Sequence, residues 1–253
     1  MAPRATARGV LSRAVATLRR HWRPLLLVAV VVFVPLGLLD VLDERFAELD
    51  PDELGTADAI GAIVIGLSRA TTELFGEIML SGAIVAAIGD VNGPGETRSL
   101  GEVLRGVPYA RLAAITVLSV LGFALGLLLF IVPGIYFLGR YVLASPIAEV
   151  EHLGIREAFA RSHELTRGHF WLVLVVLLPL SFLSGALSEL AQTAGVELLG
   201  EGLAGEWAGA TVAGVLISTP WALAAVSLVY ELRSAEGAGA RREGSRSTPV
   251  RPR

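Results

Sequence analysis

Six stretches of apolar residues, most of them near the length needed to cross a bilayer, constrain this chain more than any other feature. A membrane-spanning helix needs about 20 predominantly apolar residues. Backbone amides find no water inside a bilayer, so such stretches fold as helices. We therefore predict an all-α polytopic integral membrane protein with about six transmembrane helices and short cytoplasmic amphipathic helices at the interface. The predicted spans are 24–42, 59–88, 112–132, 134–148, 169–187 and 207–230.

Composition supports this class. Of the 253 residues, 53% are hydrophobic and 18% are charged, and the mean hydropathy is +0.64. A soluble domain of this length is usually less apolar. The chain has no cysteine, which excludes disulfides and thiolate metal sites. All 21 basic residues are arginine. With the many Ala, Gly and Val residues, this bias is typical of a GC-rich genome and suggests a bacterial source.

The arginines predict the orientation. The segments 1–23, 90–111, 149–168 and 231–253 together hold 18 of the 21 arginines, whereas the opposite loops hold one, Arg45. Loops rich in Arg face the cytoplasm. We therefore expect a multi-pass protein of the bacterial cytoplasmic (inner) membrane with both termini in the cytoplasm. The expected parts are a basic amphipathic helix at 1–23, a transmembrane domain at 24–233 and a disordered cytoplasmic tail at 234–253.

The basic N-terminus followed by an apolar run could also be a signal peptide. No cleavage site with small residues follows Leu39, and five more apolar stretches come after it. Both features favour a first span over a cleaved leader.

One block of the chain resembles a known family. Residues 131–171 contain Val-Pro-Gly-Ile-Tyr (132–136), Arg140, Ala-Phe-Ala-Arg-Ser (158–162) and Leu-Thr-Arg-Gly-His-Phe-Trp (165–171). This block, together with 218–233 near the end, resembles the glycerophosphoryl diester phosphodiesterase membrane-domain family, with YciC-like proteins as relatives. The resemblance implies a helical membrane domain. We expect this chain to lack the catalytic domain to which that membrane domain is fused in some family members.

Four charged residues fall within the predicted spans. Arg69, Glu73 and Glu77 follow one another at a spacing of four, so they share a helix face; Arg140 lies six residues beyond Gly134. Charges inside a membrane usually face the protein interior or water. We expect Arg140 and Glu77 to pair, as a structural clamp or as a substrate or gating site. If the second span is shorter, roughly 74–91, Arg69 and Glu73 form an ordinary ion pair at the outer interface.

The sequence holds no catalytic constellation, and we expect no enzyme activity, cofactor or metal. Arg156, Arg161 and Arg167 lie on a predicted amphipathic helix and could bind anionic lipid headgroups. Expected partners are membrane lipids and other membrane proteins, not nucleic acid; the sequence does not define the oligomeric state.

Two functions stay open. One is a non-catalytic membrane module that acts as a scaffold or regulator of envelope and membrane proteins. The alternative is a small transporter or lipid-handling protein that uses the Arg140–Glu77 pair.

Overall fold

The computed structural model describes residues 6–47, 74–86, 105–200 and 202–246, and every regular element in them is a helix. The prediction of an all-α polytopic membrane protein is confirmed. The elements are α1 (Ala7–Ala47), the helix Leu74–Ala86, α4 (Tyr109–Leu129), α5 (Ile131–Tyr141), α6 (Ala144–Val150), α7 (Ile155–Thr166), α8 (Phe170–Leu199) and α9 (Leu203–Arg246).

Within the described residues, 5 segments are long and apolar enough to cross a membrane. They belong to α1, α4, α5 joined with α6, α8 and α9. The helix Leu74–Ala86 is apolar but shorter than a span. It lies within the predicted second span, whose other parts, 59–73 and 87–88, fall outside the described residues. The total of six spans therefore stays a prediction.

Several boundaries differ from those expected. The basic N-terminal helix and the first span form one helix, α1, which is kinked at His21 (φ −122°, ψ 27°), close to the expected junction at Pro24. The fourth span is divided at Val142–Leu143 into α5 and α6. At the other end of the chain, α9 continues to Arg246. Residues 234–246, expected to belong to a disordered tail, are therefore helical.

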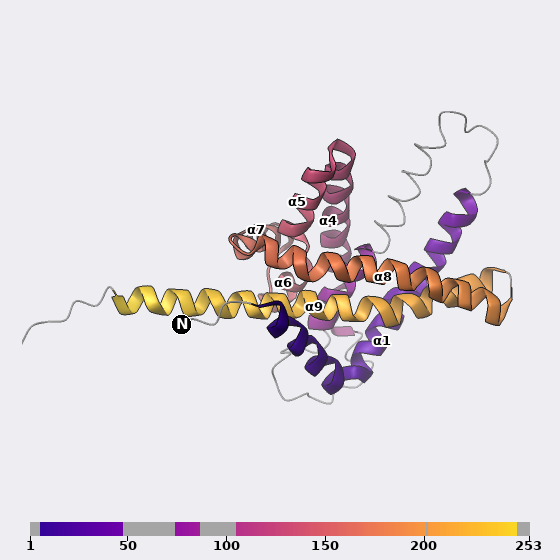
Figure 1. Ribbon diagram of the computed structural model, residues 1–253, viewed down its shortest axis with the longest axis horizontal. Coiled ribbons are helices and arrows are strands. Elements are labelled where there is room, and N and C mark those ends of the chain that lie inside the picture. Colours follow the sequence, from indigo (N-terminus) through magenta and orange to yellow (C-terminus); the bar gives the residue numbers. More distant parts are fainter. Residues whose placement is uncertain (1–5, 48–73, 87–104, 201, 247–253) are drawn as a thin grey trace, which may run out of the picture.

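The helices α8 and α9 form a long antiparallel pair, and α1 crosses α9 (Figure 1). Glycines let α8 and α9 approach closely near their connection. A Cβ atom added at Gly195 would lie 2.7 Å from the Cα atom of Gly209. The middle of α9, residues 221–229, is buried throughout. Small residues at helix contacts permit this close packing in membranes.

The helices α4 and α5 form a hairpin that stands away from the α8–α9 pair (Figure 1). Its two helices touch through glycine, since a Cβ atom at Gly126 would lie 2.8 Å from the Cα atom of Gly134. The tip of the hairpin is apolar and exposed: each residue from Leu128 to Val132 is 68% to 76% exposed. Such a surface suits a lipid environment.

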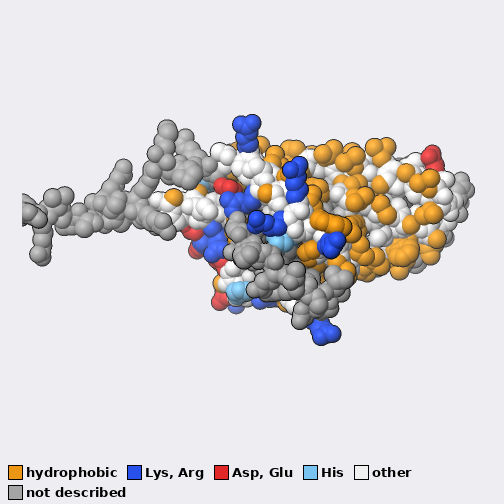
Figure 2. Space-filling model, turned by 90° about the horizontal axis from the view of Figure 1, so that it is seen from below, with side chains coloured by type: hydrophobic (Ala, Val, Ile, Leu, Met, Phe, Trp, Pro, Cys, Tyr) orange, Lys and Arg blue, Asp and Glu red, His pale blue; other side chains and the backbone are white. Residues whose placement is uncertain are grey.

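Charged and apolar side chains occupy different parts of the surface. On the face in Figure 2, arginines gather over one half of the molecule, and hydrophobic side chains cover most of the half toward the α8–α9 connection. We call the charged part the basic end. It comprises the N-terminal part of α1, the start of α4, the last turn of α5, α6, α7, the N-terminus of α8 and the part of α9 from Tyr230 onward.

Candidate functional site

A buried polar chain centres on Glu77, whose residue is only 2% exposed. The hydroxyl of Ser181 on α8 donates to Glu77 Oε2 at 3.4 Å. The indole nitrogen of Trp221 on α9 donates to the same Ser181 oxygen at 2.7 Å. This chain, which we call the Glu77 network, links three helices through polar groups inside an apolar core.

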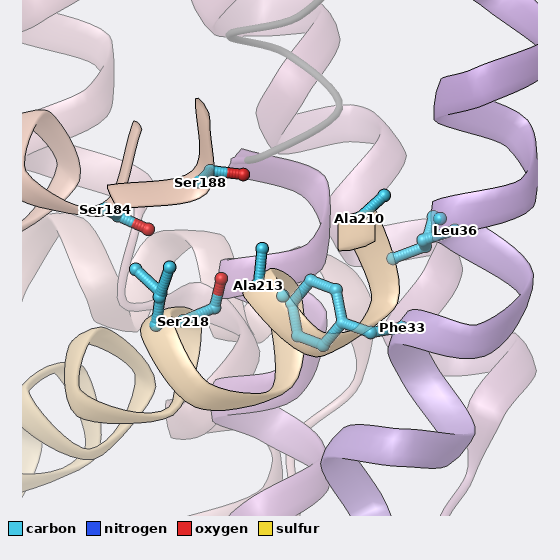
Figure 3. Close-up of a pocket in the computed structure, with 10 residues that line it drawn as sticks. Phe33, Leu36, Ser184, Ser188, Ala210, Ala213 and Ser218 are labelled. Atoms are coloured by element: carbon cyan, nitrogen blue, oxygen red, sulfur yellow. The ribbon is translucent and has the colours of Figure 1, made fainter. Parts of the chain in front are cut away.

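A small cavity adjoins the Glu77 network, between α1, α8 and α9 (Figure 3). Ser184 and Ser188 of α8 and Ser218 of α9 line it together with apolar residues. Ser184 lies one helical turn beyond Ser181. The Phe33 ring, another part of the lining, lies 2.5 Å from where a Cβ atom of Gly76 would be. The cavity measures about 40 Å³, enough for a few water molecules.

Arg140 lies elsewhere, where α5 meets α7 and α8. Its guanidinium carbon is 5.3 Å from the centre of the Tyr136 ring and 5.7 Å from that of Phe170. Its Nε and Nη1 atoms are buried and have no hydrogen-bond partner. The backbone carbonyl of Arg140 accepts a hydrogen bond from Ser162 Oγ at 2.8 Å. Arg140 is thus held by aromatic rings rather than by a carboxylate.

The predicted pair of Arg140 and Glu77 is wrong. Arg140 packs on Phe170 at the first turn of α8, whereas Glu77 contacts Ser181 further along the same helix. Ser181 lies eleven positions after Phe170 along α8, which corresponds to roughly 16 Å at 1.5 Å per residue. The two charges therefore lie at different levels along α8. Arg69 and Glu73 fall outside the described residues.

Ion pairs join the helices of the basic end. Arg161 on α7 forms two hydrogen bonds with Glu236 on α9, at 3.0 and 2.5 Å. Glu151, just after α6, accepts from Arg161 Nε at 3.0 Å and pairs with Arg233 Nε at 3.2 Å. We call Glu151, Arg161, Arg233 and Glu236 the Glu151 cluster. Two further pairs, Arg13–Glu231 and Arg111–Glu149, join α1 to α9 and α4 to α6.

Of the three arginines expected to meet lipid headgroups, Arg161 is engaged within the protein. The hydrogen bonds that Arg161 donates to Glu236, above all, and to Glu151 raise the pKa of the Arg161 guanidinium. Its charge is therefore used to hold α7 against α9. Arg156 on α7 and Arg167 just after it are exposed to solvent, so both stay candidates for headgroup contacts.

A wide cleft opens at the basic end, with a volume of about 790 Å³. Its polar lining carries both signs of charge, from Arg111, Glu149, His152 and Arg233, together with Tyr230. Within the described residues, no group of three or more His, Asp or Glu side chains could hold a metal ion.

Some of these residues were missed by sequence reasoning. Ser181 and Trp221 were not singled out, although Ser181, Ser184 and Ser188 recur at helical spacing. That spacing was the available sign of a polar face on α8. The acidic partners of Arg161 lie on other elements, which local spacing does not reveal.

Comparisons of the chain with family models, curated proteins and solved structures find no match.

Proposed function

We propose that this chain is a non-catalytic multi-pass membrane module, a scaffold or regulator that presents its basic end to other membrane proteins. The observation that carries the proposal is the Glu151 cluster, in which Arg161 and Arg233 share Glu151 while Arg161 also binds Glu236. These pairs hold α7 firmly on α9. They sit beside a cleft lined by both signs of charge, a surface suited to a polar segment of a partner.

Quantitative mass spectrometry of proteins crosslinked to the chain in native membranes tests this function. The comparison uses the wild type, Glu151→Gln, and a matched control, Glu197→Gln, on the exposed end of α8. We expect a defined set of membrane proteins to be enriched with the wild type and the control and depleted with Glu151→Gln. Enrichment of the same set by all three, or of no protein, would contradict the proposal.

We propose a bacterial inner-membrane location with both termini in the cytoplasm, supported by the arginine distribution in the sequence. Because the chain has no cysteine, single cysteines report topology cleanly. In intact spheroplasts, a membrane-impermeant maleimide should label Thr193→Cys on α8. It should label Ser234→Cys on α9 only after the membrane is permeabilised. The reverse pattern would invert the topology.

We also propose membership of the glycerophosphoryl diester phosphodiesterase membrane-domain family. The support is that the resembling block forms one packed unit. Ser162 donates to the carbonyl of Arg140, and the Cβ position of Gly139 lies 2.5 Å from the Phe170 ring. These contacts give a structural reason for the motifs to occur together.

A small transporter is a second candidate, favoured by the Glu77 network and the cavity beside it. An ionisable residue inside a membrane marks an ion or proton path in many transporters. Proton flux into liposomes that contain the purified chain tests this candidate. Flux that is lost in Glu77→Gln and kept in Glu197→Gln would favour transport. Flux no higher than in empty liposomes would argue against it.

A further inference from the structure

The environment of Arg140 is unusual for a charged side chain. Its guanidinium carbon lies 5.3 Å from the centre of the Tyr136 ring and 5.7 Å from that of Phe170. The two ring centres are 5.8 Å apart, so both rings lie to one side of the guanidinium. Aromatic faces attract a cation, but they do not accept the N–H bonds that lie in the guanidinium plane. Two of its nitrogens, Nε and Nη1, are buried without a hydrogen-bond partner. Buried charged donors in proteins are normally satisfied.

Other groups on the same segments also suit an anion. The Nδ1 atoms of His163 on α7 and His169 before α8 are buried without hydrogen-bond partners. His169 is the N-cap of α8, and no side-chain hydrogen bond caps that helix. A helix N-terminus carries a partial positive charge. The acidic residue of this part of α7, Glu164, is exposed and pairs with Arg161 at 3.7 Å.

The surroundings place this arrangement at a membrane surface. Trp171, which follows Phe170, is 74% exposed, and Val175 one turn later is 62% exposed. Tryptophan is enriched at the level of lipid headgroups. Arg140 itself keeps partial exposure, so a headgroup can reach the edge of its guanidinium.

We propose that Arg140, held against the neighbouring rings of Tyr136 and Phe170, binds the phosphate group of a phospholipid at the basic end. A phosphate oxygen at the accessible edge of the guanidinium would accept N–H bonds there, in the charge-assisted manner typical of arginine. The N-terminus of α8, which begins at Phe170 beside Arg140, adds a partial positive charge near the phosphate. This site is independent of the Glu151 cluster and goes beyond the scaffold function proposed above.

Lipid titrations of the purified full chain in detergent, followed by native mass spectrometry and thermal unfolding, test the site. The probes are phosphatidylglycerol, diacylglycerol, which lacks the phosphate, and inorganic phosphate. The variants are Arg140→Gln and the matched control Arg105→Gln, an exposed arginine just before α4. We expect phosphatidylglycerol, but not diacylglycerol, to bind and stabilise the wild type and the control. Arg140→Gln should weaken that binding by about tenfold or more.

Each other outcome has a definite meaning. Equal binding of phosphatidylglycerol to Arg140→Gln and wild type would overturn the site. Equal binding of diacylglycerol and phosphatidylglycerol would overturn phosphate recognition. Saturation by inorganic phosphate at the same concentrations would overturn the lipid as the source of the phosphate. If Arg140→Gln does not fold, Phe170→Leu keeps the charge and removes one ring. Unchanged phosphatidylglycerol affinity in that variant would also overturn the proposal.

Discussion

Arg161 and Glu236, 75 residues apart in the sequence, meet in a two-bonded ion pair with Nη1–Oε1 and Nη2–Oε2 distances of 3.0 and 2.5 Å. The guanidinium matches the carboxylate edge to edge, which is the favoured geometry for this pair. Its third nitrogen, Nε, reaches Glu151 at 3.0 Å. One side chain of α7 therefore joins the end of α6 to α9.

This pair should couple α7 and α9 measurably. The Arg161 side chain is 23% exposed and that of Glu236 is 52% exposed, so solvent screens part of the attraction. We expect a coupling free energy of about 0.5–1 kcal/mol between Arg161→Gln and Glu236→Gln in a double-mutant cycle. Denaturant unfolding in detergent, followed by circular dichroism, measures it.

Arg156 supplies the matched control for that cycle. It is exposed on the same helix, and its substitution removes the same charge. Arg156→Gln and Glu236→Gln should act additively. Additive effects in both cycles would show that the Arg161–Glu236 contact contributes nothing to stability.

The difference between the expected and observed roles of Arg161 shows what local patterns miss. Helical spacing correctly places Arg161 on an α-helix, and a residue near a membrane surface is readily assigned to lipid headgroups. Its actual partners lie before α7 and far along the chain on α9. Tertiary pairing of this kind has no periodic signature. The same contact holds Glu236 of α9 against α7, within a segment that is polar enough to suggest disorder and yet continues α9 to Arg246.

Arg140 illustrates a second limit. Apolar stretches correctly indicate that membrane helices exist, because bilayer thickness fixes their length. They do not fix the residue at which each helix begins. The helix α5 begins at Ile131 and is interrupted after Tyr141, which brings Arg140 to the first turn of α8 instead of the level of Glu77.

The hairpin of α4 and α5 should be sensitive to a single methyl group. Gly126→Ala would place a Cβ atom 2.8 Å from the Cα atom of Gly134, so one backbone must move. We expect a loss of about 1–3 kcal/mol in the free energy of unfolding. Gly237→Ala in α9 is the control, because nothing lies within 4 Å of its Cβ position. If both variants unfold at the same denaturant concentration, the close approach of Gly126 and Gly134 is not a feature of the folded protein.

The Glu77 network makes a prediction about Trp221. Trp221→Phe keeps an aromatic ring in the core but removes the N–H group that binds Ser181 at 2.7 Å. The Ser181 hydroxyl then loses one partner while it stays half-buried, and we expect a loss of about 1 kcal/mol. Thermal unfolding in detergent measures the change. In a Ser181→Ala background the acceptor is absent, so Trp221→Phe should reduce the free energy of unfolding much less than it does in the wild type. An equal loss in both backgrounds would show that the indole N–H does not bind Ser181.

The turn between α7 and α8 depends on the backbone of Gly168, which has a φ of +87°. Nothing lies within 4 Å of its Cβ position, so space does not limit substitution there. An L-residue is nevertheless strained at this φ, and Gly168→Ala should cost about 1 kcal/mol in the free energy of unfolding. Gly154→Ala, before α7, tests the argument, because Gly154 has a φ of −70° that any residue adopts. Chemical unfolding should show a larger loss of stability for Gly168→Ala than for Gly154→Ala. The free energy of unfolding of Gly168→Asn should lie between those of Gly168→Ala and the wild type, because asparagine tolerates a positive φ better than alanine. Equal losses for Gly168→Ala and Gly154→Ala would mean that the turn does not require a left-handed residue.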